Sequence, residues 1–447
     1  MARLFISAAH KSSGKTVVST GLAAALSTGQ DVRCFKKGPD YIDPMWLGAA
    51  SGHPCYNLDF NTMPAAELLG LFSSRANGDI ALIEANKGLY DGVDLHGADS
   101  NAALAKLLKA PVVLVIDTLG TTRGIAPLLL GYQAFDPSVN IAGVILNKVG
   151  GPRHEAKLRA AVAEYTDMPV LGAIGKHRAL EIGERHLGLT TPAESGGFQA
   201  MIATIGEIIG GSVDLDTLRS IAASAPRLQA SARMQAKAGP SVKIGIPRDT
   251  AFGFYYADDL EALAAAGAEL VFFNTLKDRQ LPEIDGLFIG GGFPETQMQA
   301  LEANAPLRAE IKAAIEAGLP TYAECGGLMY LCETLTWRGE VRQMVGAVKG
   351  DAVMGPRPQG RGYTRLKSLG GMWQNGTEIL AHEFHYARVE NLPADTRFAY
   401  EVQRGHGVDG RHDGVLSHNM LAGFCHLRHS QATPWATRFV DFVRTRA

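Results

Sequence analysis

A cysteine stands at the sharpest turn expected in the chain, within the segment TYAECGGLMY at residues 321–330. A strand pattern runs into Cys325, two glycines follow it, and a helical pattern then begins. This order is typical of a nucleophile elbow, a turn that lifts a side chain toward solvent in a place that favours thiolate. Free cysteines are more often small buried hydrophobic residues, which is our interpretation of Cys34, Cys332 and Cys425. The adjoining glycines favour a nucleophile at Cys325 instead.

A second glycine-rich loop, IGGGFPE at residues 289–295, follows another apolar strand pattern in the same half of the chain. Backbone N–H groups of Gly291 and Gly292 could stabilise the oxyanion that forms when a thiolate attacks an amide. Three glycines are also compatible with a plain strand-to-helix turn. The loop is therefore a candidate oxyanion hole.

A thiol nucleophile needs a base, and several histidines follow Cys325 in the sequence. The segment of residues 413–429, DGVLSHNMLAGFCHLRH, contains a strand pattern whose end could bring a histidine to the thiol. Spacing alone does not choose between His426 and His429. Both stay open as the base at this point.

A phosphate-binding loop is indicated near the N-terminus, where AHKSSGKT follows an apolar strand and opens a helix. Backbone N–H groups at such a helix start bind phosphates, a lysine meets the outer phosphates, and the next hydroxyl binds Mg²⁺. The loop departs from the Walker A pattern at Ala9, where glycine is usual. The predicted nucleotide-binding residues are Ser12, Ser13, Gly14, Lys15 and Thr16.

Polar residues follow other predicted strands, where a nucleotide-bound Mg²⁺ would find carboxylates. One group is the loop KGPDYIDP, residues 37–44, which includes Asp43; another acid, Glu84, ends the strand DIALIEA. Taken singly, each acid could be a helix cap or a turn residue. Asn147 closes a further strand, and its amide could pair with the adenine edge. We predict Thr16, Asp43 and Glu84 as metal ligands.

The elements that must position these residues alternate along the chain. Short β-branched runs and helical patterns follow one another through the first half, which predicts a doubly wound α/β sheet with ligands at the carboxyl ends of its strands. A second α/β series begins at the strand pattern SVKIGIP. We therefore predict a first domain over residues 1–221, a linker over 222–240 and a second domain over 241–447.

Bulk properties narrow the class of protein. The 447 residues carry a formal net charge of −2 with 46% hydrophobic residues, as in an ordinary globular protein, and no surface for nucleic acid is indicated. Neither a signal peptide nor an apolar run long enough to span a membrane is expected. Five cysteines without a C-x-x-C pair argue against disulfides and favour a reducing cytoplasm.

Taken together and in this order, the motifs resemble the cobyrinic acid a,c-diamide synthase family of cobalamin biosynthesis, which includes the hydrogenobyrinic acid enzymes. The resemblance covers nearly the whole chain, and further motifs such as HEFHY at 382–386 add to it. The segments that carry it are Lys37 to Pro44, Glu84 to Gly92, Asn147 to Val149 and Glu324 to Tyr330.

The resemblance implies a P-loop domain like dethiobiotin synthetase that uses ATP and Mg²⁺, followed by a class I glutamine amidotransferase domain. It implies glutamine and a corrin ring as substrates, amidated at the a and c acetates, and a homodimer is one assembly it allows. It places the nucleophile on Cys325 and the activating histidine on His426. It also implies a substrate-binding role for Lys37, Asp40, Tyr41, Tyr90 and Asp91.

Two departures from the family pattern and several alternative activities accompany this resemblance. Besides Ala9, the segment GFCHLR at 423–428 stands where the family more often has Ser-Tyr-x-His-Leu-His. No acidic third member of a catalytic triad is evident, and a Cys–His pair is expected. A cobyric acid synthase or a nickel sirohydrochlorin amidating enzyme would be a related activity. A non-catalytic P-loop regulator or partitioning ATPase belongs to another class, and it predicts no glutaminase activity.

Overall fold

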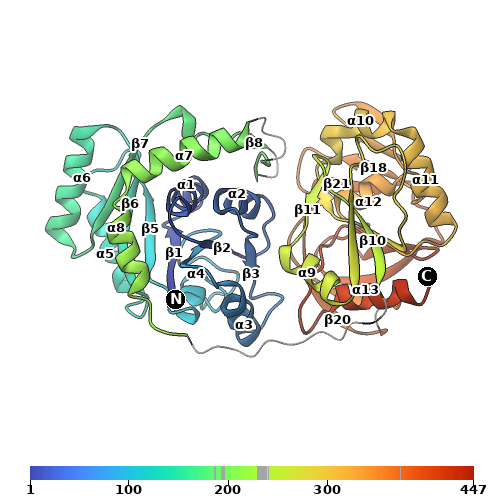
Figure 1. Cartoon of the computed structure of the whole chain (residues 1–447), viewed down its shortest axis with the longest axis horizontal. Coiled ribbons are helices and arrows are strands. Elements are labelled where there is room, and N and C mark those ends of the chain that lie inside the picture. The colour runs from blue at the N-terminus through green and yellow to red at the C-terminus, as the bar shows by residue number, and fades with distance from the viewer. Residues whose placement is uncertain (186–187, 193–196, 229–238, 240, 373, 447) are drawn as a thin grey trace. The chain divides into compact units, whose positions relative to one another are not determined.

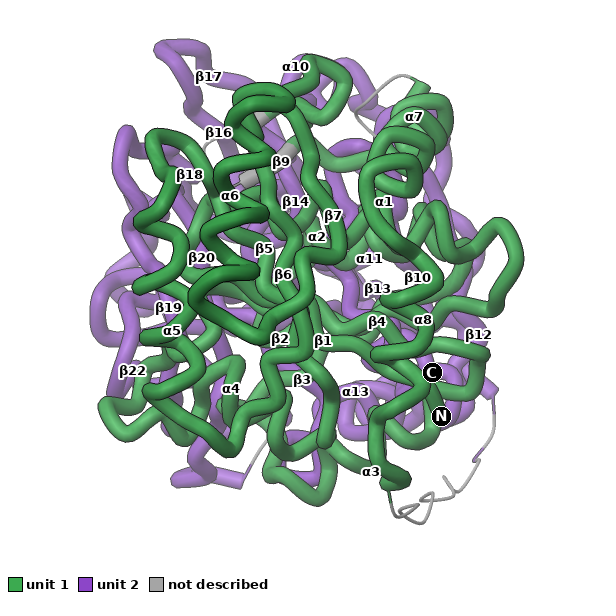
Figure 2. The backbone as a smooth tube through the Cα atoms, turned by 90° about the vertical axis from the view of Figure 1, so that its left-hand side faces the viewer, with its two compact units in different colours: residues 1–233 green, residues 234–447 purple. Residues whose placement is uncertain are grey.

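The computed structural model describes residues 1–185, 188–192, 197–228, 239, 241–372 and 374–446. These residues form two compact units, Met1–Arg233 and Met234–Ala447, which are coloured separately in Figure 2. The predicted linker, 222–240, lies mostly outside the described residues. Its first two residues complete the last helix of the first unit.

A seven-stranded parallel sheet forms the centre of the first unit, in the order β3-β2-β4-β1-β5-β6-β7 (Figure 1). Its strands are apolar along nearly their whole length because helices cover both faces of such a sheet. Their bounds are β1 (Ala2–Ala8), β2 (Val32–Lys37), β3 (Tyr56–Leu58), β4 (Ile80–Glu84), β5 (Val112–Asp117), β6 (Ile141–Val149) and β7 (Val170–Gly175).

Helices connect these strands, and three of them (α1, α2 and α7) pack against one another. The helices are α1 (Lys15–Ser27), α2 (Ile42–Ser51), α3 (Ala65–Arg75), α4 (Asn101–Leu107), α5 (Ile125–Phe135), α6 (Pro152–Tyr165), α7 (Phe198–Ser212) and α8 (Leu215–Ala223). A 3₁₀ turn, η1 (Arg178–Leu180), and a small hairpin, β8 (Glu184–Arg185) with β9 (Gly188–Leu189), precede α7.

One local expectation was wrong. The segment 37–44 was predicted as a loop, but only residues 38–41 lie between β2 and α2, and Asp43 belongs to the first turn of α2. The Asp40 side chain caps this helix: its Oδ1 accepts from the N–H groups of Ile42 and Asp43 at 3.0 and 3.1 Å. A cap of this kind satisfies the first free N–H groups and lets the helix begin early.

The second unit contains a nine-stranded mixed sheet in the order β12-β10-β13-β15-β24-β23-β22-β19-β20. Its first five strands are parallel and the others antiparallel. The strands are β10 (Val242–Pro247), β12 (Ala268–Phe273), β13 (Gly286–Ile289), β15 (Thr321–Glu324), β19 (Gly360–Ser368), β20 (Glu378–His385), β22 (Arg397–Arg404), β23 (His412–Ser417) and β24 (Met420–Gly423).

Alternate residues of this sheet enter two separate cores. Phe288 packs with Trp435 in one core, whereas its neighbour Ile289 packs with Ile311 and Leu328 in the other. The first core contains α9 (Ala257–Ala265) and α13 (Trp435–Arg444), and the second contains α11 (Ala305–Glu316) and α12 (Gly326–Leu331).

Smaller elements complete the second unit. They are the pair β11 (Phe252–Phe254) and β14 (Gly291–Gly292), the turn η2 (Pro294–Gln297), α10 (Met298–Ala303), and a four-stranded sheet of β16 (Thr334–Trp337), β17 (Glu340–Gln343), β18 (Asp351–Met354) and β21 (Ala387–Glu390). None of the helices in the described ranges has the length and apolar character needed to cross a membrane.

Candidate functional site

Cys325 occupies a strained turn between β15 and α12. Its φ and ψ are 49° and −102°, a conformation that L-residues rarely adopt, and such strain is common at functional sites. The Cys325 N–H donates to the carbonyl oxygen of Gly423 at 2.8 Å, which ties the turn to β24. The predicted strand–cysteine–helix arrangement is therefore present.

The expectation that the elbow lifts Cys325 into solvent was wrong. Only 5% of the residue is exposed, because neighbouring backbone closes around the turn. A Cβ atom on Gly326 would lie 3.0 Å from both Gly292 N and Pro294 Cδ. The thiol is therefore buried, and hydrogen bonds and charges act strongly in such surroundings.

His426 follows the neighbouring strand β24 and reaches Cys325. Strands β15 and β24 are parallel, with Glu324 opposite Gly423, so residues just beyond their ends meet. Burial alone would lower the pKa of His426, but Cys325 and Glu324 outweigh it and raise this pKa to about 10. A hydrogen bond to Cys325 is among the causes. This geometry suits a thiol and its base.

Glu324 completes an acid–histidine–thiol arrangement, although the sequence showed no acidic third member. Its Oε2 lies 3.3 Å from Nδ1 of His426. Its other oxygen accepts from the Tyr322 hydroxyl at 2.5 Å and from the Leu427 N–H at 2.8 Å. These contacts fix the carboxylate so that it can orient the imidazole ring.

His382 lies against the ring of His426, the candidate base. Its ring is stacked on that of His426, with centroids 4.9 Å apart and planes 15° from parallel. Two backbone hydrogen bonds join the residues as well: His426 N–H to His382 O at 2.8 Å, and His382 N–H to His426 O at 3.3 Å. Burial, His426 and Arg428 hold the pKa of His382 well below its ordinary value, so it is a neutral neighbour.

His429, the alternative base, is engaged elsewhere. Its backbone N–H donates to Asp259 Oδ1 at 2.9 Å, on helix α9. Burial and the nearby Arg428 lower the pKa of His429 to about 4. Of the two histidines that spacing left open, the structure brings His426 to Cys325.

The second glycine loop borders the thiol site. A Cβ on Gly291 would come within 2.7 Å of His426 Cε1, and one on Gly292 within 2.0 Å of the Ala251 carbonyl oxygen. Glycine is thus required at both positions for the backbone to approach this closely. The loop lies where an oxyanion hole would be needed, and that role stays a prediction.

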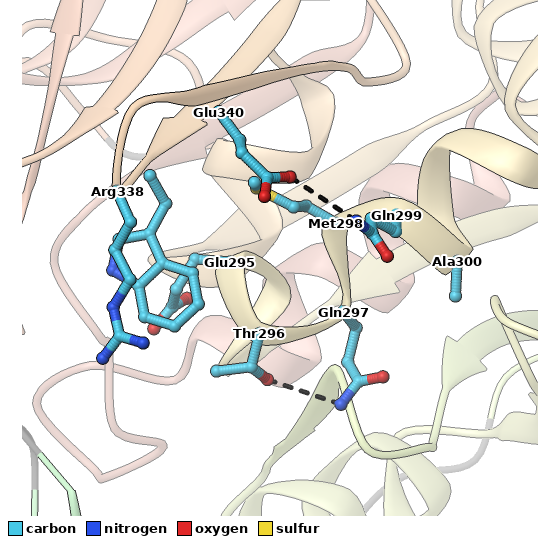
Figure 3. A pocket seen from close by; sticks show the side chains of 9 residues that line it. Glu295, Thr296, Gln297, Met298, Gln299, Ala300, Arg338 and Glu340 are labelled. Atoms are coloured by element: carbon cyan, nitrogen blue, oxygen red, sulfur yellow. Dashed lines mark hydrogen bonds between the residues drawn. The ribbon is translucent and has the colours of Figure 1, made fainter.

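A pocket of about 400 Å³ lies directly beyond this loop (Figure 3). Its wall begins at Glu295, three residues after Gly292, and includes the stacked pair Trp337 and Arg338. Charged and amide side chains line much of it. No sequence pattern indicated the pocket, because its walls come from η2, α10 and a distant hairpin.

In the first unit, the predicted phosphate loop connects β1 to α1. Gly14 has φ +86°, and a Cβ there would lie 2.2 Å from Asn147 Nδ2. That amide nitrogen donates to Ser13 O at 2.9 Å, while Asn147 Oδ1 accepts from the Lys148 N–H at 2.9 Å. Asn147 therefore braces the loop. Its predicted adenine contact stays a prediction, and the second N–H of Nδ2 and the second lone pair of Oδ1 are the groups that could make it.

Other contacts hold the loop in place. Lys148 Nζ donates to Ser12 O at 3.3 Å, and the Tyr132 hydroxyl donates to Ala9 O at 2.5 Å. Lys15 is buried. Its burial and, to a smaller extent, the positive charge of Lys36 lower its pKa. An anchored loop at a strand-to-helix turn, with a lysine at the start of the helix, suits phosphate binding.

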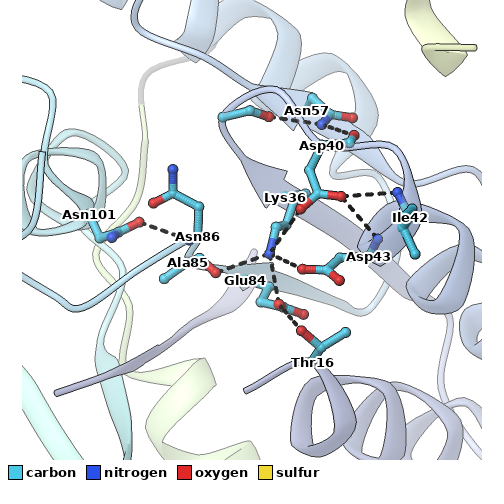
Figure 4. Close-up of polar contacts among 11 residues, drawn as sticks. Thr16, Lys36, Asp40, Ile42, Asp43, Asn57, Glu84, Ala85, Asn86 and Asn101 are labelled. Carbon is cyan, nitrogen blue, oxygen red and sulfur yellow. Dashed lines mark hydrogen bonds and ion pairs between the residues drawn. The ribbon is translucent and has the colours of Figure 1, made fainter. Parts of the chain in front are cut away.

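The predicted metal ligands lie around Lys36, a residue that the sequence did not single out (Figure 4). Thr16 Oγ1 donates to Glu84 Oε1 at 3.1 Å, and Lys36 Nζ lies 2.8 Å from the same oxygen and 2.6 Å from Asp43 Oδ2. Burial raises the pKa of Glu84. Burial would also raise that of Asp43, but Lys36 outweighs it and the pKa falls. Two carboxylates and one hydroxyl are a donor set that fits Mg²⁺ with nucleotide phosphates.

The predicted substrate residues do not form one cluster. Asp40 lies 3.9 Å from Lys36 Nζ, and Tyr41 stands next to it at the start of α2. Lys37 is buried at the end of β2, and burial lowers its pKa. Tyr90 instead donates its hydroxyl to Tyr132 O at 2.6 Å, and the exposed Asp91 accepts from the Gly88 N–H at 3.0 Å.

Two family models match the chain, one in each unit. Residues 5–189 match a CobQ/CobB/MinD/ParA nucleotide binding domain, and residues 243–433 match a CobB/CobQ-like glutamine amidotransferase domain. With the sheets described above, these matches confirm the predicted fold class, a nucleotide-binding α/β half followed by a glutamine amidotransferase half.

Curated relatives match from end to end. A cobyrinate a,c-diamide synthase from Magnetococcus marinus is 46% identical over 99% of this chain and 97% of its own length. A cobyrinate a,c-diamide synthase from Methanosarcina barkeri is 40% identical over 99% of this chain and 96% of its own length. A solved structure of PurLQS from Thermotoga maritima covers 46% of this chain and 98% of its own, at 17% identity and a TM-score of 0.36.

Proposed function

The chain belongs to the cobyrinate a,c-diamide synthase family, and we propose that it amidates the a and c acetate carboxylates of a corrin ring with ammonia from glutamine. The substrate is cobyrinic or hydrogenobyrinic acid, and ATP supplies the driving force. The main support is that a buried Cys325–His426–Glu324 arrangement and a phosphate loop beside carboxylates occur in one chain that is 46% identical to such an enzyme over 99% of its length.

In the second unit, Cys325 thiolate attacks the side-chain amide of glutamine. The oxyanion of the tetrahedral intermediate is stabilised by backbone N–H groups of the loop at Gly291 and Gly292. His426 gives its proton to the leaving ammonia while Glu324 keeps its ring oriented. A water molecule, deprotonated by His426, then cleaves the thioester and releases glutamate.

In the first unit, the γ-phosphoryl group of ATP passes to a ring carboxylate, giving ADP and an acyl phosphate. Ammonia attacks the carbonyl carbon and inorganic phosphate leaves, which forms the amide. Lys15 and the loop N–H groups hold the phosphates. Thr16, Asp43 and Glu84 would hold Mg²⁺, which neutralises phosphate charge when bound. Lys37, Asp40, Tyr41, Tyr90 and Asp91 are proposed to face the ring.

Cys325→Ala tests whether the second unit releases ammonia from glutamine and the first unit uses it. Cys332→Ala is the matched control, because Cys332 is also buried but lies at the other end of α12. Cys325→Ala should abolish amidation from glutamine and retain amidation from ammonium salts, whereas Cys332→Ala should retain both. A folded Cys325→Ala protein that loses both activities would contradict the proposal.

The ring substrate is tested by mass spectrometry after incubation with ATP, Mg²⁺ and glutamine. Metal-free and cobalt-containing rings are supplied separately, and one added amide at each of the a and c acetates is expected on the ring that is the substrate. Addition of further amides to a ring that is already an a,c-diamide would instead identify a cobyric acid synthase activity.

A further inference from the structure

The ammonium group of Lys36 lies among the side chains predicted to bind Mg²⁺ (Figure 4). Its Nζ is 2.6 Å from Asp43 Oδ2, 2.8 Å from Glu84 Oε1 and 3.2 Å from the Ala85 carbonyl oxygen. Thr16 donates its hydroxyl to the same Glu84 oxygen. A divalent cation bound by these residues would therefore use oxygens that Lys36 already contacts.

Burial makes these charges depend on one another. The side chains of Lys36 and Glu84 are 1% and 0% exposed, and that of Asp43 is 18% exposed. A buried charge is stable only when it is paired. Without Lys36, Asp43 and Glu84 would lose the cation that is hydrogen-bonded to both of them, and only the charge of Lys15 would still act on the two carboxylates.

One carboxylate oxygen beside Lys36 is available to a ligand. Glu84 Oε2 is buried and has no hydrogen-bond partner within the described ranges. Among those same residues, no three histidine, cysteine or acidic side chains gather as a complete metal site. The protein offers two carboxylates and a hydroxyl, and a Mg²⁺ site of this composition normally takes its remaining oxygens from phosphates and water.

We propose that Lys36 is a positioning residue that takes the place of the divalent cation in the nucleotide-free protein, so that metal binds only together with nucleotide. A metal ion arriving alone would meet the Lys36 ammonium at its own ligands, and the two positive charges repel. A triphosphate brings negative oxygens with which the displaced ammonium can pair. This inference rests on the proposed use of ATP and Mg²⁺.

A purely structural ion pair is the competing explanation, and wild-type protein distinguishes the two. Mn²⁺ is titrated and followed by its electron paramagnetic resonance signal, with and without the ATP analogue that has a β,γ-imido bridge. We expect protein-bound Mn²⁺ only when the analogue is present. Equally tight Mn²⁺ binding to the protein alone would overturn the inference, whereas failure of the analogue to bind at all would overturn the proposed function instead.

The Lys36→Met variant gives the converse test. With the lysine charge removed, Asp43 and Glu84 should bind Mn²⁺ without nucleotide, and millimolar Mg²⁺ alone should raise the melting temperature of the variant but not of wild type. Lys106→Met is the control, because Lys106 pairs with one carboxylate, Asp136, at 2.7 Å, and neither residue belongs to the predicted nucleotide or metal site. It should gain no metal binding.

Lys36→Arg and the Mg²⁺ dependence of Lys36→Met folding test the same inference. Lys36→Arg keeps the charge and should behave as wild type. If Lys36→Met folds only when Mg²⁺ is present during refolding, the cation has replaced the lysine and the inference stands. A Lys36→Met protein whose folding or melting temperature is indifferent to Mg²⁺ would overturn it.

Discussion

Glu324 and His426 are joined through Oε2 and Nδ1 at 3.3 Å, although Glu324 ends β15 and His426 follows β24, about a hundred residues later. Because Glu324 immediately precedes Cys325, the end of one strand supplies both the nucleophile and the acid that orients its base. The base comes from beyond the adjacent strand. The site therefore depends on a single strand pairing, β15 with β24.

Glu324→Gln should lower the rate of glutamine hydrolysis roughly 10²-fold, the usual contribution of a well-oriented acid–base group. It should also move the basic limb of the pH–rate profile to lower pH. The limb moves in this direction because Glu324 is one of the groups that raise the pKa of His426 to about 10. Removing its negative charge lowers that pKa, so the imidazolium is lost at lower pH. Steady-state glutaminase assays across the neutral and alkaline range measure both effects.

Tyr322→Phe is the control for this variant, since it removes a hydrogen bond from the other oxygen of Glu324 and leaves the contact to His426. It should retain the position of the basic limb. An unchanged profile in Glu324→Gln would show that this carboxylate does not act through His426. Amidation from ammonium salts should be unaffected by either change.

His382 should support the base through ring stacking. His382→Ala removes the stacked ring and should lower the glutamine-dependent rate by up to about tenfold, since such contacts contribute roughly 0.5–1.5 kcal/mol. His382→Phe keeps an aromatic ring against His426 and should retain most of the activity. Equal losses in the two variants, measured as kcat with glutamine, would point to a role for the His382 imidazole nitrogens instead.

Gly14→Ala should weaken nucleotide binding at least tenfold. Alanine rarely adopts φ +86°, and its Cβ would lie 2.2 Å from Asn147 Nδ2, so the loop must change shape. Gly29→Ala is the control, because no heavy atom lies within 4 Å of the added Cβ. Isothermal titration with ATP measures both. Unchanged affinity in Gly14→Ala would separate this loop from the nucleotide site.

Several strands of the two sheets could be predicted because each is a short apolar run that is mostly buried. Patterns at 2–8, 141–149 and 242–247 correspond to β1, β6 and β10. The glycines around Cys325 likewise predicted its turn. What these patterns could not show is which side chains face one another across strands that lie far apart in the sequence.

Two residues were missed for a common physical reason. Side chains alternate between the faces of a strand, so consecutive residues are not expected to meet one partner. The positive φ of Cys325 breaks this alternation and lets Glu324 and Cys325 both reach His426. In β2, alternation separates Lys36 from Lys37, and the sequence does not say which of the two faces the carboxylates.

His429 provides a last prediction, about stability in acid. Burial and Arg428 lower its pKa to about 4 in the folded protein, against an ordinary 6.5. Between these values the unfolded chain binds the proton more readily, so stability falls as pH drops from 6.5 to 4, by at most about 1.4 kcal/mol per pH unit. His429→Phe should flatten this decline in urea unfolding measured across this pH range. An acid limb that is equally steep in His429→Phe would show that other groups cause it.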